Sequence, residues 1–115
     1  MQHEMHLDTI YFNYIKDGIK LYETRVYDKK RQKINLLDII EFTDRNSGKT
    51  FKAKITELSW HSNFRDAISQ VGVRKVLPNA KSLNDGIDIY EAFDNGNYKK
   101  NAKIFGVLRM KFMVI

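Results

Sequence analysis

Gly18-Ile19-Lys20-Leu21-Tyr22-Glu23-Thr24-Arg25 (GIKLYETR) joins a predicted helix to a predicted strand. Upstream, apolar residues recur with helical spacing and predict a helix from Ile10 to Asp17. Gly18 follows directly, at a position where glycine is favoured because it adopts positive φ angles. Residues 21–26 are β-branched and aromatic enough to favour a strand. The pattern G-x-K-x-x-E-x-R therefore places a cation, an anion and a second cation at a helix-to-strand junction.

Past Arg25 the sequence predicts a loop and then an antiparallel hairpin. Residues 27–35 are expected to form an exposed basic loop that carries Lys29, Lys30, Arg31 and Lys33. A strand at 37–42 is followed by a turn at 44–49, whose Asp, Asn, Ser and Gly residues tolerate turn dihedrals. In the next strand Phe51, Ala53 and Ile55 alternate with Lys52 and Lys54. This period of two predicts one inward apolar face and one outward polar face.

The second half of the chain predicts two helices and a closing strand. Ser62 or Asn63 can cap a helix that stops near Gly72, and Ser82 with Asp85 has the spacing of a capping box. That second helix is expected to break at 95–97, and residues 104–115 to form the last strand. This order predicts an α+β fold: a small β-barrel of about five to six strands flanked by two to three short helices.

Composition bounds the class of protein. The 115 residues, 43% of them hydrophobic and 30% charged, are typical of one globular domain spanning 1–115. No apolar run approaches the roughly 20 residues that span a bilayer, and no secretory signal is evident, so we expect no membrane association and a cytoplasmic location. The absence of cysteine excludes disulfides, thiolate catalysis and cysteine-based zinc sites. We predict no metal and no cofactor.

The formal net charge of +6 favours polyanionic partners, namely RNA, DNA, nucleotides or acidic surfaces. The basic loop is a candidate for tracking phosphates, although a solvated surface loop explains it equally well. Contacts of this kind supply affinity and salt dependence but do not select a sequence. Trp60, the only tryptophan, follows the predicted hairpin strand in a polar context and is a candidate to stack on a base.

In this order and spacing, the sequence resembles the ASCH family of the PUA-like superfamily. The resemblance covers nearly the whole chain, because the G-x-K-x-x-E-x-R stretch is followed by similar segments at 38–42, 56–58, 76–78 and 106–108. One departure is Leu37, where the family usually has glycine. The resemblance implies a PUA-like β-barrel with a cleft that binds RNA or modified nucleosides.

One branch of the family resembles amidohydrolases that act on acetylated cytidine with a Lys, a Thr and a Glu. The lysine matches Lys20, but Glu23 occupies the position of the threonine nucleophile, with Thr24 one residue later. Adjacent strand residues point to opposite faces, so Thr24 is not a simple substitute. For the distal glutamate of that branch, the candidate in this sequence is Glu91.

The candidate catalytic residues are therefore Lys20, Glu23 and Thr24, and the candidate ligand-binding residues are Gly18, Lys20, Glu23, Arg25, Lys29, Lys30, Arg31 and Trp60. Lys20 can contact a phosphate or act as a desolvated base or nucleophile, and Glu23 can orient it or pair with Arg25. Strict alternation places Glu23 and Arg25 on one face and Lys20 on the other. The three converge only if the chain bends near Lys20, which Gly18 permits.

Three functions follow. The first is a module that holds RNA or a nucleotide-like ligand in a cleft around Lys20, Glu23 and Arg25. The second is a small hydrolase of modified nucleosides or of RNA that uses the same cluster. The third is a protein-interaction domain whose basic face meets an acidic partner. The oligomeric state is not predicted.

Overall fold

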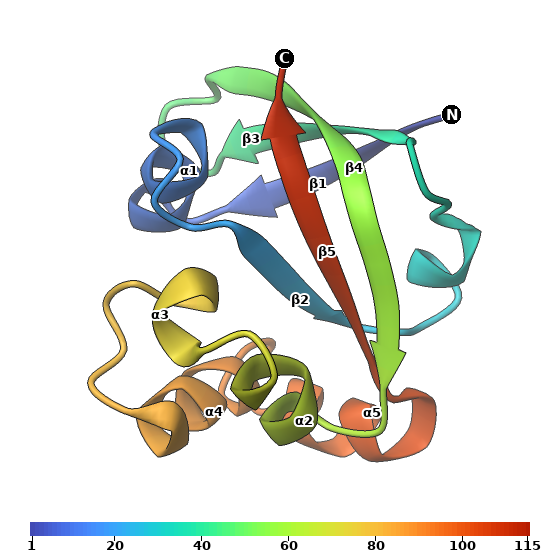
Figure 1. The fold of residues 1–115 in the computed structure, drawn as a ribbon, viewed down its shortest axis with the longest axis vertical. Coiled ribbons are helices and arrows are strands. Elements are labelled where there is room, and N and C mark those ends of the chain that lie inside the picture. The colour runs from blue at the N-terminus through green and yellow to red at the C-terminus, as the bar shows by residue number, and fades with distance from the viewer.

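The computed structural model describes all residues 1–115 and contains one curled five-stranded sheet with the strand order β1-β3-β4-β5-β2 (Figure 1). Its strands are β1 (Gln2–Leu7), β2 (Tyr22–Val26), β3 (Ile39–Asp44), β4 (Thr50–His61) and β5 (Val107–Val114). The β1–β3 pair is parallel and the other three pairs are antiparallel. The α+β class and the small, barrel-like sheet predicted from the sequence are confirmed.

Five helices and one short 3-10 turn accompany the sheet, more than the two to three helices expected. They are α1 (Thr9–Lys16), η1 (Arg31–Lys33), α2 (Phe64–Ser69), α3 (Val73–Val76), α4 (Leu83–Glu91) and α5 (Asn97–Phe105). Helices α2 to α5 gather at one end of the sheet, away from α1 (Figure 1). None of the helices is long and apolar enough to cross a membrane.

The predicted helix starts are confirmed in the second half of the chain. The Asn63 side chain accepts a hydrogen bond from the Asp66 amide at 2.8 Å and caps α2. The Ser82 hydroxyl accepts one from the Asp85 amide at 3.1 Å and caps α4. Each cap satisfies an amide that the first helical turn leaves without a backbone partner.

Several boundaries differ from the sequence-based prediction. The last strand begins at Val107 rather than at 104, because α5 extends to Phe105. This helix was missed because most of its residues are polar, and Ala102 is its only buried side chain. Strand β4 continues to His61, so that Trp60 lies within a strand rather than after one. Residues 73–76, assigned to no element from the sequence, form the short helix α3.

The hairpin of β3 and β4 is antiparallel with its two faces as predicted, although Phe51, expected inward, is only half-buried. Phe42 pairs with Phe51, and Ile40 pairs with Ala53. Phe42, Ala53 and Ile55 are buried, whereas Lys52 is exposed and Lys54 is half-buried. The Phe42 and Phe51 rings lie 5.4 Å apart between centroids, so the hairpin supplies the aromatic centre of the core.

The curled sheet does not close, because β1 and β2 are its two edges. A side chain bridges this seam: Nη2 of Arg25 in β2 donates to the backbone carbonyl of His6 in β1 at 3.1 Å. At the seam this side-chain hydrogen bond joins the two edge strands, which share no backbone ladder. Edge strands that remain unpaired leave space where polar groups from several elements can meet.

Leu37 has a φ of 72°, in the left-handed region that favours glycine. This conformation explains why the resemblance expects glycine at this position. Leu37 is exposed, so its side chain gains little burial in return. The departure from the family pattern therefore strains one turn and leaves the fold intact.

Candidate functional site

The turn after α1 brings Lys20 toward the β2 residues. Gly18 has a φ of +75°, and the amides of Ile19 and Lys20 both donate to the Tyr14 carbonyl, at 2.9 and 3.0 Å. Lys20 therefore precedes β2, which begins at Tyr22, and is not subject to strand alternation. The bend that the sequence permitted is present, and Lys20, Glu23 and Arg25 meet.

The three residues form a buried charge cluster with a tyrosine from α4. Glu23 Oε1 lies 3.2 Å from Lys20 Nζ, and Arg25 Nε donates to Glu23 Oε2 at 3.3 Å. The Tyr90 hydroxyl donates to Glu23 Oε1 at 2.6 Å. Lys20 is 2% exposed and Glu23 is 4% exposed. Charges at this depth persist only when they are paired and hydrogen-bonded, as they are here.

All the donors of Lys20 are occupied within the protein. Besides its pairing with Glu23, Nζ donates to the Val76 carbonyl and, at 3.1 Å, to the Tyr90 hydroxyl. An ammonium group has three N–H donors, which matches these three acceptors. Lys20 therefore orients Glu23 and Tyr90 and retains no donor for a ligand in this conformation.

The protonation states follow from this arrangement. Burial lowers the pKa of Lys20, and the charge of Glu23 opposes that change. Burial alone would raise the pKa of Glu23, but Lys20, Arg25 and the Tyr90 hydrogen bond outweigh it and hold that pKa at about 2. Burial and the Glu23 charge raise the pKa of Tyr90 well above 10. At neutral pH Glu23 is thus an anion, and Tyr90 remains a hydrogen-bond donor.

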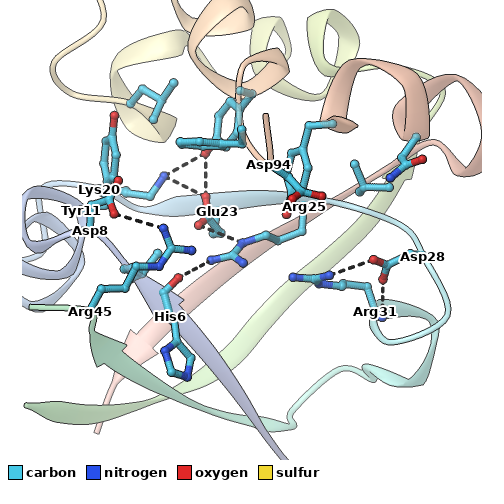
Figure 2. A pocket seen from close by; sticks show the side chains of 17 residues that line it. His6, Asp8, Tyr11, Lys20, Glu23, Arg25, Asp28, Arg31, Arg45 and Asp94 are labelled. Atoms are coloured by element: carbon cyan, nitrogen blue, oxygen red, sulfur yellow. Dashed lines mark hydrogen bonds and ion pairs between the residues drawn. The ribbon is translucent and has the colours of Figure 1, made fainter. Parts of the chain in front are cut away.

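A cavity of about 470 Å³ lies over the cluster at the seam between β1 and β2 (Figure 2). This volume is in the range of small-molecule sites. Its walls come from β1, α1, β2, the basic loop, α4 and α5. The lining residues are His6, Leu7, Asp8, Tyr11, Lys20, Glu23, Arg25, Val26, Asp28, Arg31, Arg45, Leu77, Tyr90, Phe93, Asp94, Tyr98 and Asn101.

Three guanidinium groups border the cavity, and each has one acidic partner. Arg25 pairs with Glu23, Arg31 Nη1 lies 2.9 Å from Asp28, and Arg45 Nη1 lies 3.1 Å from Asp8 (Figure 2). A guanidinium has five N–H donors, so pairing with one acidic residue leaves some of these donors without a partner. The Nη1 group of Arg25 has no protein partner, and the buried Nε of Arg31 has none either.

The charges around the cavity balance. Four of its lining residues are Lys or Arg and four are Asp or Glu, so the formal charges cancel with His6 neutral. The net charge of +6 therefore resides outside the cavity. The cavity itself suits a polar ligand rich in hydrogen-bonding groups, and a polyphosphate would gain little there.

The wall formed by α4 and α5 adds aromatic surface. The Phe93 and Tyr98 rings lie 5.9 Å apart in an edge-to-face arrangement, and Phe93 also packs edge-to-face on Tyr90 at 5.5 Å. Flat rings beside unused guanidinium donors are a combination that recognises planar, polar molecules.

Sequence reasoning missed several lining residues because they lie far along the chain from the junction. They are Tyr90, Phe93 and Tyr98 in the α4–α5 region and Arg45 in the hairpin turn. No local pattern distinguishes these residues from core aromatics or an exposed turn arginine. The packing of α4 and α5 against the sheet end brings the three aromatic residues to the cavity, whereas Arg45 reaches it through the hairpin turn, where its amide donates to the Leu7 carbonyl at 3.0 Å.

Other sequence candidates lie outside the cavity. Gly18 forms the turn behind it, Lys29 and Lys30 are exposed beyond it, and Trp60 lies on β4. Thr24 is completely buried, and its hydroxyl has no hydrogen-bond partner. The distal candidate Glu91 borders a separate, smaller cavity.

No group of three or more His, Cys, Asp or Glu side chains is placed to hold a metal ion. The arrangement at the seam thus consists of one buried ion-pair cluster, three guanidinium groups and an aromatic wall.

A curled half-barrel with a polar cavity at its open seam is the architecture expected of a PUA-like domain. The sequence matches the ASCH domain family over residues 5–113, and the chain belongs to this family. The resemblance based on the G-x-K-x-x-E-x-R stretch is therefore confirmed.

Solved structures agree with this assignment. The chain is similar to the crystal structure of the hypothetical protein PH0355, with 34% identity, a TM-score of 0.87 and full coverage of both chains. It is also similar to the solution structure of protein PF0455 from Pyrococcus furiosus, with 30% identity and a TM-score of 0.77. That similarity covers 100% of this chain and 98% of the other. No curated protein matches the sequence.

Proposed function

We propose that residues 1–115 act as one cytoplasmic RNA-binding domain, which holds an unpaired nucleotide of single-stranded RNA in the seam cavity. The observation that carries the proposal is the cavity itself, about 470 Å³ in volume, where guanidinium donors face an aromatic wall. Arginine donors and aromatic rings are the groups that recognise exposed bases in RNA-binding proteins.

The distribution of charge supports RNA over a small polyphosphate. The cavity is balanced in charge, whereas Lys29, Lys30, Lys99, Lys100 and Lys103 are exposed on the loop and on α5, two elements that also form its walls. A base in the cavity and phosphates on the surrounding lysines would use both features. Phosphate contacts of this kind release counterions and make binding sensitive to salt.

The buried cluster supports binding over chemistry. Glu23, with a pKa of about 2, is too weak a base to accept a proton readily at neutral pH. All the donors of Lys20 are occupied, and the Thr24 hydroxyl is buried away from the cavity. We assign Lys20 and Glu23 to positioning Arg25, whose Nη1 group has no protein partner, and the buried Tyr90, whose ring packs edge-to-face on Phe93 in the cavity wall.

Binding is tested by fluorescence anisotropy with a short labelled single-stranded RNA. We expect affinity at low salt, with a steep fall between about 50 and 200 mM salt. Arg31→Gln and Tyr98→Ala should each weaken binding about 5-fold or more, because each removes a cavity contact. Arg74→Gln, which removes an equal charge from an exposed site outside the cavity, is the matched control.

Two outcomes would overturn the proposal. One is the absence of RNA binding at low salt, and the other is RNA binding that Arg31→Gln and Tyr98→Ala weaken no more than Arg74→Gln. An assay with acetylated cytidine addresses the hydrolase alternative. Turnover that disappears in a folded Lys20→Met variant would replace binding with catalysis at this cluster.

A further inference from the structure

We propose that Trp60 forms a second RNA contact outside the cavity, where its indole stacks on a base of the same single strand. This inference rests on the proposed function, since it concerns the nucleotides that flank the one in the cavity. The inferred site stacks a nucleobase at a position distinct from the cavity, close to other lysines, and Trp60 emission can report its occupancy.

The sheet register places Trp60 beside the cavity. Arg25 in β2 and Trp60 in β4 are both paired with Leu108 in β5, so the three residues form one row across the sheet. Paired residues in a sheet project from the same face. Because neighbouring strands lie about 4.8 Å apart, the Cα atoms of Arg25 and Trp60 are separated by about 10 Å. Leu108 between them is buried, whereas Trp60 is 54% exposed.

The indole is held in a fixed position although half of it faces solvent. Its Nε1 donates to the Phe105 carbonyl at 3.1 Å, at the end of α5. Its ring covers Gly106, where an added Cβ would lie 2.5 to 2.6 Å from the indole atoms. Gly106 also has a φ of +79°. An aromatic ring that is ordered before binding loses little conformational entropy when a base stacks on it.

Two lysine-bearing segments, α5 and the basic loop, reach the place where the indole is anchored. Helix α5 carries Lys99, Lys100 and Lys103 and contains no acidic residue. The Tyr27 amide donates to the Gly106 carbonyl at 3.0 Å, so the basic loop with exposed Lys29 and Lys30 starts at the same place. The lower end of β4 lies beside α5 (Figure 1).

This combination favours single-stranded nucleic acid as the occupant. A flat, exposed ring next to a lysine-bearing helix and a lysine-bearing loop matches a base and its flanking phosphates, and such stacking tolerates any base because each has a π face. Helix α5 belongs to both sites, because Tyr98 and Asn101 line the cavity while its lysines are exposed. One strand can therefore occupy the cavity and continue over the outer surface to Trp60.

The single tryptophan makes the inference directly measurable. We would titrate the wild-type protein with oligouridylate and with uridine monophosphate while recording Trp60 emission. We expect oligouridylate to quench the emission and the mononucleotide to leave it nearly unchanged. Trp60→Ala should weaken oligouridylate binding about 5- to 150-fold, and Trp60→Phe should retain most of the affinity.

The outcomes separate this inference from the proposed function. If oligouridylate binds, depends on Arg31, leaves Trp60 emission unchanged and binds equally to Trp60→Ala, the stacking site is overturned and the cavity proposal stands. If oligouridylate shows no binding by anisotropy at low salt, both are overturned. If polyglutamate quenches Trp60 and displaces oligouridylate equally well, the surface belongs to an acidic protein partner and the stacking site is overturned. Thermal unfolding of each variant verifies its fold.

Discussion

Replacement of Glu23 by glutamine tests whether the buried cluster beneath the cavity holds the sheet edge in place. The substitution keeps the shape of the side chain and removes its charge. It leaves Lys20 and Arg25, whose side chains are 1% and 11% exposed, without their shared anion. The new amide can also turn an N–H toward Arg25 Nε, which is itself a donor.

The magnitude follows from the burial. Removal of one partner from a buried ion pair costs about 3–5 kcal/mol, because the remaining charge stays desolvated. A domain of this size has a total unfolding free energy of roughly 5–15 kcal/mol, so the variant would lose a large share of it. With a urea m value of about 1.5 kcal/mol/M, the unfolding midpoint would fall by about 2–3 M.

Urea titration at neutral pH, followed by circular dichroism and by Trp60 emission, measures the change. The matched control is Glu57→Gln, because Glu57 is 60% exposed and lies 3.6 Å from Lys111 in a solvated pair. Exposed pairs contribute about 0–1 kcal/mol, so this control should move the midpoint by well under 1 M. A Glu23→Gln variant as stable as the Glu57→Gln control would refute the assignment of the cluster as the support of the site.

Three further predictions concern pH and backbone conformation. The folded-state pKa of Glu23, about 2, lies below the unfolded value of 4.5, so its stabilisation is present above pH 4.5 and is lost as the pH falls toward 2; a melting temperature that stays constant across that window would contradict this. Leu37→Gly should raise the unfolding free energy by up to about 1 kcal/mol, because glycine removes the strain of the positive φ. The greater freedom of glycine in the unfolded chain cancels part of this gain; a lower urea midpoint would argue against the prediction. Gly106→Ala should destabilise by about 1–3 kcal/mol and shift Trp60 emission, whereas Gly48→Ala, with a similar φ of +75° and open space around it, should leave that emission unchanged.

Local patterns predicted much of the fold because their causes are local. These patterns are the glycine after α1, the helix caps at Asn63 and Ser82, and the alternation in the hairpin. Each reflects a backbone preference that depends on only a few adjacent residues. The sequence did not predict helix α5, because this helix is stabilised by packing against β2 and α4 and not by an apolar stripe of its own. Tertiary contacts override weak local signals in short, polar segments.

The candidate site also has one part that the sequence indicates and one part that depends on tertiary structure. That Lys20, Glu23 and Arg25 lie close together along the chain is evident from the sequence, and the family pattern indicates the type of fold. The sequence left open whether Lys20 shares a face with the other two, since strand alternation indicated that it does not. Tertiary structure decided that question through the turn at Gly18 and through burial, which makes unpaired charges too unfavourable to tolerate. It also decided which distant residues complete the site, because Tyr90 and Tyr98 reach the seam only when the helices pack on the end of the sheet.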